Sequence, residues 1–288
     1  MGLFKNRLGE LLPGWKVILA IVLVVIFALV ATNLISLVIS LSLLVFGYSV
    51  VDFQANYFFM AIISQTGFLL GSLFAFKIFF RRPFRDIGLH RSKNSLSQMA
   101  IGLVFGAVSI SSVYFVLLLS GHIEVIEVSF KNSNDLLVGL ILFLVVGFSE
   151  EVLFRGYIMH VIDIFKKPWA TVFFSSVLFS LAHIGNPNLT TLGLINIGFV
   201  GILFAQMFIK TKSLWMPIGY HITWNYFQGN ILGLPVSGLD TSSIISSQVV
   251  KHDILSGGAF GPEGGLIVTF IIGLGFLFLK KITSSVNL

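Results

Sequence analysis

Long apolar runs separated by short polar connections dominate the 288-residue sequence. A helix that crosses the hydrocarbon core of a bilayer needs about 20 mostly apolar residues, and the runs reach that length repeatedly. No polar linker or soluble-looking block interrupts the pattern. It therefore predicts an all-α, polytopic integral membrane bundle, with a single membrane domain over residues 1–288. About eight transmembrane helices are expected, near 15–46, 55–80, 98–120, 135–160, 168–187, 191–210, 213–234 and 263–281.

Composition supports the same class of protein. Hydrophobic residues make up 56% of the chain and charged residues only 10%, whereas soluble domains carry about 25% charged residues. The absence of cysteine excludes disulfides, thiolate metal ligands and a cysteine nucleophile. The net charge of +6 does not indicate nucleic acid, because the basic residues stand in small groups between apolar runs. The expected surroundings are membrane lipid.

The basic residues predict an orientation. Fifteen of the 18 Lys and Arg residues fall on one side of the eight-span arrangement, two (Lys131 and Lys251) fall on the other, and Arg155 lies inside a span. Cytoplasmic loops carry the excess of Lys and Arg, so both termini are expected in the cytoplasm. The first apolar stretch is too long for a cleaved signal peptide. We therefore expect it to remain as a span.

Small residues indicate where helices can approach closely in lipid. Three pairs of glycines four residues apart stand in the predicted spans, at Gly67 and Gly71, Gly102 and Gly106, and Gly229 and Gly233. Asn33 and Gln65 are single polar residues in spans, which more often form interhelical hydrogen bonds than bind ligands.

Charged and polar residues gather in three of the spans, where each charge costs about 2.5 to 3.5 kcal/mol to insert. Helical spacing places Glu151 and Arg155, four apart, on one face, while Glu150 is rotated by about 100°. Glu151 can therefore pair with Arg155, which leaves Glu150 without a local cation and free to act as a general base. The other two groups are Phe179 with His183, and His221 with Asn225, each four residues apart.

Depth in the membrane brings these groups together. At about 1.5 Å per residue, Glu150 and His183 lie about 24 Å from their nearest predicted cytoplasmic lysines, and His221 and Asn225 about 13 and 20 Å. A carboxylate at that depth can activate water, while imidazole and carboxamide groups hold water, metal or oxyanion. For each group the alternative is structural: an ion pair that locks a helix, or a buried hydrogen-bonded histidine.

Several other catalytic classes lack their motifs. No His is followed by Glu as in helical zinc proteases, no Gly-x-Ser-x-Gly elbow occurs, and every Asp lies in a loop or at the edge of a span. These absences disfavour zincin, serine and aspartyl intramembrane proteases. Glutamate and histidine chemistry remains.

The three groups, taken in order, resemble the CPBP family of CAAX proteases and bacteriocin-processing enzymes, also called Abi-type proteins. The family pattern is Glu-Glu-x-x-x-Arg, then Phe-x-x-x-His, then His-x-x-x-Asn. The resemblance covers a catalytic core at about residues 135–234, and Gly-Pro-Glu-Gly-Gly at 261–265 is similar to the family's tails. The matching residues are Glu150, Glu151, Arg155, Phe179, His183, His221 and Asn225.

The resemblance implies a bacterial cell-membrane endopeptidase that acts on membrane-associated peptides, of prenylated or leader type. Glu150 would activate water with help from His183, while His221 and Asn225 would hold the oxyanion. The family has been described both as metal-dependent and as a glutamate-type protease. If a divalent metal such as zinc binds, Glu150, His183 and His221 are its expected ligands.

Two other functions stay open at this point. In a non-catalytic scaffold or bacteriocin-immunity protein, the motif residues would only hold the helices together, and Glu150→Gln would keep the phenotype. A proton-coupled transporter could use buried Glu and His as a relay, although no inverted repeat is visible in the sequence.

Overall fold

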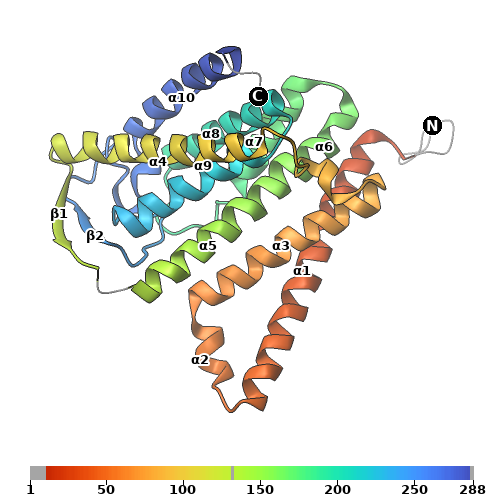
Figure 1. Ribbon diagram of the computed structural model, residues 1–288, viewed down its shortest axis with the longest axis horizontal. Coiled ribbons are helices and arrows are strands. Elements are labelled where there is room, and N and C mark those ends of the chain that lie inside the picture. The colour runs from red at the N-terminus through yellow and green to blue at the C-terminus, as the bar shows by residue number, and fades with distance from the viewer. Residues whose placement is uncertain (1–10, 131–132, 286–288) are drawn as a thin grey trace.

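The computed structural model describes residues 11–130 and 133–285, so Lys5, Arg7 and Lys131 of the charge count lie outside the described residues. The chain is a helical bundle with a two-stranded ribbon at one end (Figure 1). Its α-helices are α1 (Pro13–Val45), α2 (Val50–Ala55), α3 (Tyr57–Phe80), α4 (Ser95–Leu119), α5 (Ser133–Glu151), α6 (Met159–Ile162), α7 (Pro168–Leu181), α8 (Thr191–Thr211), α9 (Trp215–Tyr226) and α10 (Leu266–Ser285). Its strands are β1 (Ile123–Val128) and β2 (Ile245–Val249).

Shorter turns extend or connect these helices. A π-helical turn at Val152–Ile158 joins α5 to α6, so residues 133–165 form one continuous helical segment. A second π-helical turn, Phe227–Ile231, continues α9. Single 3-10 turns lie at Phe84–Ile87, Asp163–Phe165, Gly258–Phe260 and Pro262–Gly264.

Every predicted span contains a helix, and the all-α membrane fold is confirmed. By length and composition, five helical segments of the described residues could cross a membrane: 13–45, 57–80, 95–119, 133–165 and 191–211. The 33-residue α1 is unbroken, and the side chain of Asn33 donates to Leu29 O of its own helix. The predicted span 168–187 ends early, at Leu181, so His183 lies in the turn that follows α7.

Basic residues end three of the helices. Arg81, Lys166 and Lys212 each adopt a left-handed conformation directly after a helical segment. Cations are favoured there because the last carbonyls of a helix carry partial negative charge. After Lys166 the chain restarts at Pro168, whose fixed φ suits the first turn of α7. These ends fix where α7 and α9 begin.

Two of the glycine pairs bring helices into close contact. A Cβ on Gly71 of α3 would stand 2.6 Å from Ala28 N of α1, and one on Gly106 of α4 would stand 2.3 Å from Tyr220 O of α9. Side chains larger than glycine would push these helices apart. The third pair does not act in this way, because Gly233 lies beyond the helix with a φ of +66°.

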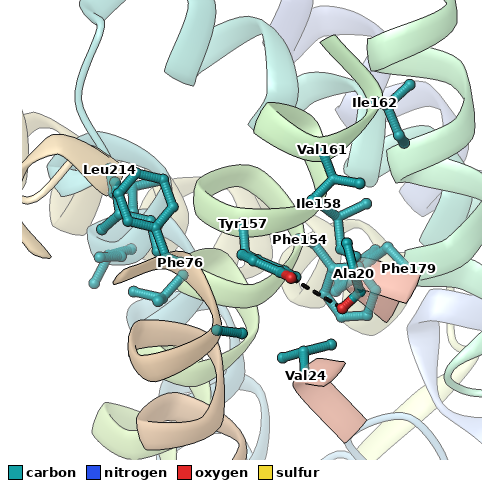
Figure 2. Close-up of a cluster of buried hydrophobic side chains, with 14 of the residues drawn as sticks. Ala20, Val24, Phe76, Phe154, Tyr157, Ile158, Val161, Ile162, Phe179 and Leu214 are labelled. Atoms are coloured by element: carbon teal, nitrogen blue, oxygen red, sulfur yellow. Dashed lines mark hydrogen bonds between the residues drawn. The ribbon is translucent and has the colours of Figure 1, made fainter. Parts of the chain in front are cut away.

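The core connects the 133–165 segment to α1 and α3. Figure 2 shows Tyr157 between α1 and α3, with its hydroxyl donating to the carbonyl oxygen of Ala20 at 2.9 Å. The ring of Tyr157 is fully buried and Val24 packs in the same cluster. This contact fixes the 133–165 segment against α1 at the level of residue 157, about 10 Å along the helix from Glu150 at 1.5 Å per residue.

The antiparallel ribbon of β1 and β2 was not expected. It pairs the connection after α4 with the segment after α9, with an irregularity between Val125 and Glu127. Figure 1 shows the ribbon at the end of the bundle remote from the start of α1. Tyr114 of α4 contacts Ser247 of β2 through their hydroxyls at 3.1 Å, which secures the ribbon to the bundle.

Candidate functional site

The side chains of Glu150 and Glu151, at the end of α5, lie in different surroundings. Glu151 is completely buried, and its Oε1 accepts a hydrogen bond from Arg155 Nη1 at 3.0 Å. Glu150 faces a cavity, with 14% of its side chain exposed. Helical spacing thus predicted the placement correctly: Glu151 pairs with Arg155, and Glu150 faces away from that pair.

Arg155 is enclosed on every side. Its Nη2 donates to Gly201 O on α8 at 3.1 Å. The guanidinium also lies over the rings of Phe179, at 4.2 Å from the centroid, and Phe204, at 5.1 Å. Aromatic faces attract cations through their quadrupole. The Arg155 charge is thus balanced by Glu151 and two rings, and Phe179 and Phe204 separate this pair from the cavity that they line.

His221 of α9 is held by the same assembly. Its Nδ1 lies 3.0 Å from Glu151 Oε1, and its ring stacks on Phe204 at 5.3 Å between centroids. Because Glu151 Oε1 also accepts from Arg155 Nη1, it is an acceptor for His221 as well, and Nδ1 is assigned the proton. The other nitrogen, Nε2, then offers a lone pair toward Glu150 Oε2, 3.8 Å away.

His183 repeats this arrangement from the turn after α7. Its Nδ1 lies 2.8 Å from the carbonyl oxygen of Phe179, which can only accept, so Nδ1 again carries the proton. The Phe179 ring meets the imidazole edge to face, with 5.0 Å between the ring centroids and 71° between the ring planes. The Nε2 of His183 lies 4.0 Å from Glu150 Oε2.

Three acceptor atoms therefore converge on one point. Glu150 Oε2 is buried and has no hydrogen-bond partner in the described part of the chain. In their neutral, Nδ1-protonated form, the imidazoles of His183 and His221 face it with the lone pairs of Nε2. Acceptors do not attract one another, so the arrangement fits a group that supplies protons or positive charge between them, such as a water molecule or a cation.

Gln65 of α3 completes the surroundings of Glu150. Its Nε2 donates to Glu150 Oε1 at 3.2 Å, which leaves Oε2 for the histidines. From the sequence, Gln65 was expected to form an interhelical hydrogen bond and had no place in the site. The two residues are 85 positions apart, so no local spacing could have connected them.

The cavity above these groups has a volume of about 320 Å³. Asn225 lies on its wall four residues after His221, as predicted, and is 7% exposed. Glu150, His183 and His221 line it as well, so it contains all four residues predicted to be catalytic. The predicted supporting residues Glu151 and Arg155 lie behind the wall.

A second carboxylate, Glu263, also lines the cavity. Its Oε2 accepts from Ser237 N at 2.5 Å and from Ser237 Oγ at 2.8 Å. Asn196 of α8 fixes its backbone by donating to Glu263 O at 2.8 Å. Burial raises the pKa of this carboxyl, and the Ser237 hydrogen bonds oppose the rise. The sequence marked Glu263 only through the family-like tail at 261–265.

The donor set suits a divalent cation in chemical type. Glu150 Oε2 and the Nε2 atoms of His183 and His221 are a carboxylate and two neutral imidazoles, which are common zinc ligands, and Glu151 and Phe179 O fix the imidazoles as outer partners do in metal sites. No group of three His, Cys, Asp or Glu residues in the described ranges is already arranged closely enough to hold an ion. The side chains would have to move together to bind one.

Comparison with known proteins adds one finding. Residues 132–227 match the family described as Type II CAAX prenyl endopeptidase Rce1-like. The match covers the segments that carry Glu150, His183, His221 and Asn225. It leaves out α3 and the loop that carries Glu263. No curated protein and no solved structure matches the chain.

Proposed function

We propose that this multi-pass membrane protein cleaves peptide bonds within membrane-associated substrates, with Glu150 as the base that activates water. The match of residues 132–227 to the family described as Type II CAAX prenyl endopeptidase Rce1-like supports the proposal. The observation that carries the proposal is the convergence of Glu150 Oε2 with the Nε2 atoms of His183 and His221 in a cavity. Such a point binds water with its protons directed to the protein.

The geometry supports a sequence of proton transfers. A water molecule between the three acceptors donates one O–H to Glu150 Oε2 and the other to an imidazole Nε2, so its lone pair is free to attack a carbonyl carbon. As the C–O bond forms, Glu150 takes the water proton. The same carboxyl then gives that proton to the leaving nitrogen as the C–N bond breaks, so the products are a carboxylic acid and an amine.

The negative charge on the carbonyl oxygen needs a donor. Asn225 lies on the cavity wall beside His221, and its carboxamide N–H is the neutral donor proposed for the oxyanion. His221 can donate to the oxyanion only after its Nε2 takes up a proton, and Glu151 then lies beside the new charge. A divalent cation held by Glu150, His183 and His221 would polarise the carbonyl and acidify its water.

Purified variants test the proposal. Glu150→Gln keeps the size of the side chain and removes the base, so kcat for a cleaved peptide should fall by about 100-fold or more. His183→Ala and His221→Ala should also lose most activity. Glu124→Gln, an exposed carboxylate on β1, is the matched control and should cleave at the wild-type rate. Wild-type turnover in Glu150→Gln would overturn the role of Glu150 as base. A cellular phenotype that Glu150→Gln keeps, with no cleavage by the wild type, would favour the scaffold or immunity role instead.

The substrate can be found in cells. Comparing the termini of membrane proteins between cells that carry the wild type and Glu150→Gln should reveal new ends that depend on Glu150. The two expected types of substrate would differ in where they are cut. A prenylated tail would be cut near its carboxyl end, and a leader-type peptide near its amino end.

A further inference from the structure

His183 reaches the site without the support of a regular helix. The helix α7 ends at Leu181, and His183 lies in the turn that follows it. The side chain is bonded through Nδ1 to the carbonyl oxygen of Phe179, and the His183 carbonyl oxygen accepts from Asn186 N at 3.0 Å. Turns are more mobile than the elements they connect. The position of His183 therefore depends on what this turn packs against.

Two loops from later parts of the chain interlock with this turn. One follows α9 and contains Ser237, and the other is the loop before α10, at 257–265, which contains Glu263. Asn186 Nδ2 donates to Ser237 O at 3.1 Å, and Ser237 donates twice to Glu263 Oε2. Because Asn186 N also donates to His183 O, one series of hydrogen bonds connects Glu263 to the backbone of His183.

The backbone of these loops shows how closely the three segments fit. Ser237 has a φ of +48°, which is uncommon for a residue with a side chain. A Cβ on Gly238 would stand 2.0 Å from Pro187 O in the turn after α7, and one on Gly261 would stand 2.2 Å from Pro235 O. Strained backbone of this kind persists only where its surroundings hold it. The three segments are thus placed together.

Glu263 anchors this series of hydrogen bonds to two helices. Asn196 of α8 donates to Glu263 O at 2.8 Å and to Gly265 O at 2.9 Å, and its Oδ1 accepts from Thr269 of α10. The carboxyl can accept both Ser237 hydrogen bonds in either protonation state, because a proton on Oε1 leaves Oε2 an acceptor. The anchor therefore does not depend on the charge of Glu263.

From these contacts we infer that Glu263 is a positioning residue of the site, which acts through Ser237 to hold the turn that carries His183. The inference rests on the proposed peptidase function, and it adds a residue beyond the matched range 132–227. His183 Nε2 lies 4.0 Å from Glu150 Oε2 in the cavity that Glu263 also lines. Because a shift of about 1 Å at a catalytic group can lower a rate about 100-fold, losing the anchor should act on kcat.

Removal of the carboxyl tests the inference. Glu263→Met keeps the length of the side chain and removes the acceptor for Ser237. On a peptide with a Glu150-dependent cut site, kcat of the detergent-solubilised full-length protein should fall about tenfold or more, with KM little changed. Glu127→Met, which replaces an exposed carboxylate on β1, is the control and should keep the wild-type rate. An unchanged kcat in Glu263→Met, or a change confined to KM, would overturn the inference.

The conservative variant separates positioning from a direct role of the carboxyl charge or proton. Glu263→Gln keeps an acceptor oxygen for Ser237, so it should recover most of the kcat that Glu263→Met loses. Recovery stays incomplete, because the indole N–H of Trp224 also hydrogen-bonds to the Glu263 carboxyl and a carboxamide has only one acceptor oxygen. If Glu263→Gln were as slow as Glu263→Met, the positioning role would be wrong.

A second break in the same series keeps the test decisive if Glu263→Met does not fold. Asn186→Ala removes the hydrogen bond to Ser237 O from a half-buried turn residue, and it should also lower kcat with little change in KM. Where both variants fold, the double variant should be no slower than the slower single variant, because both changes break one connection. Losses in kcat that multiply would contradict a shared path to His183.

Hydrogen exchange gives a readout that needs no cleavage. The backbone amides of residues 183–187 should exchange faster in Glu263→Met than in the wild type and in Glu127→Met, because the turn has lost its anchor. Unchanged exchange in this turn would overturn the inference and leave the proposed function standing. Wild-type turnover in Glu150→Gln would instead overturn the proposed role of Glu150 itself.

Discussion

At the scale of single residues, the hydrogen bond from Gln65 to Glu150 assigns Gln65 a positioning role. It engages Oε1 and so directs Oε2 to the histidines. Gln65→Met keeps the length of the side chain and removes the donor, and hydrogen bonds to charged groups contribute about 1.5–3 kcal/mol. We expect kcat to fall about 10- to 100-fold with KM little changed. A change confined to KM would show that Gln65 only contacts substrate.

The buried pair of Glu151 and Arg155 predicts a double variant that recovers thermal stability but not activity. Removing one partner leaves a buried unpaired charge and should cost about 3–5 kcal/mol, so Glu151→Leu should lower the melting temperature in detergent. The double variant Glu151→Leu with Arg155→Met removes both charges and should recover much of that loss. It should stay inactive, because Glu151 also holds Nδ1 of His221. Recovery of activity would contradict this role for Glu151.

Residue spacing explains which of these contacts the sequence could predict. Helical residues four apart lie on one face, which places Glu151 beside Arg155 and Asn225 on the face of His221. Phe179 and His183 are also four apart, and they stay in contact although α7 ends at Leu181. Gln65 and Glu263 reach the site from other elements, and only the packing of α3 and of the loop before α10 brings them there. Contacts of that kind leave no periodic signal in one sequence.

At the scale of elements, the glycine contact between α4 and α9 positions the helix that carries His221. A Cβ on Gly106 would lie 2.3 Å from Tyr220 O, whereas a Cβ on Gly273 of α10 meets nothing within 4 Å. Gly106→Ala should therefore destabilise the protein by about 1–3 kcal/mol through overpacking. Gly273→Ala, its matched control, should be neutral or stabilise α10, since alanine favours helix by about 1 kcal/mol. Thermal unfolding in detergent measures both, and equal effects would contradict the contact.

The sequence predicted where the helices lie better than where they end. Lipid demands long apolar helices, which makes their positions readable, and all eight predicted ranges contain one. The early end of α7 and the ribbon of β1 and β2 lie at the boundaries, where hydropathy changes sign and gives little guidance. The ribbon pairs Ile123 with Val249, a contact between two connections that no local pattern indicates.

At the scale of the whole molecule, the basic residues still predict an orientation that can be measured. Lys167, before α7, belongs to the predicted cytoplasmic side, and Lys251, after β2, to the opposite side; both side chains are exposed. Because the chain has no cysteine, Lys167→Cys and Lys251→Cys each introduce a single thiol. In intact cells, a membrane-impermeant maleimide should label Cys at 251 and reach Cys at 167 only after permeabilisation, since cytoplasmic loops carry the basic excess. The reverse labelling pattern would place both termini on the outer side of the membrane. The helix ends at Arg81, Lys166 and Lys212 would then lie on the outer side as well.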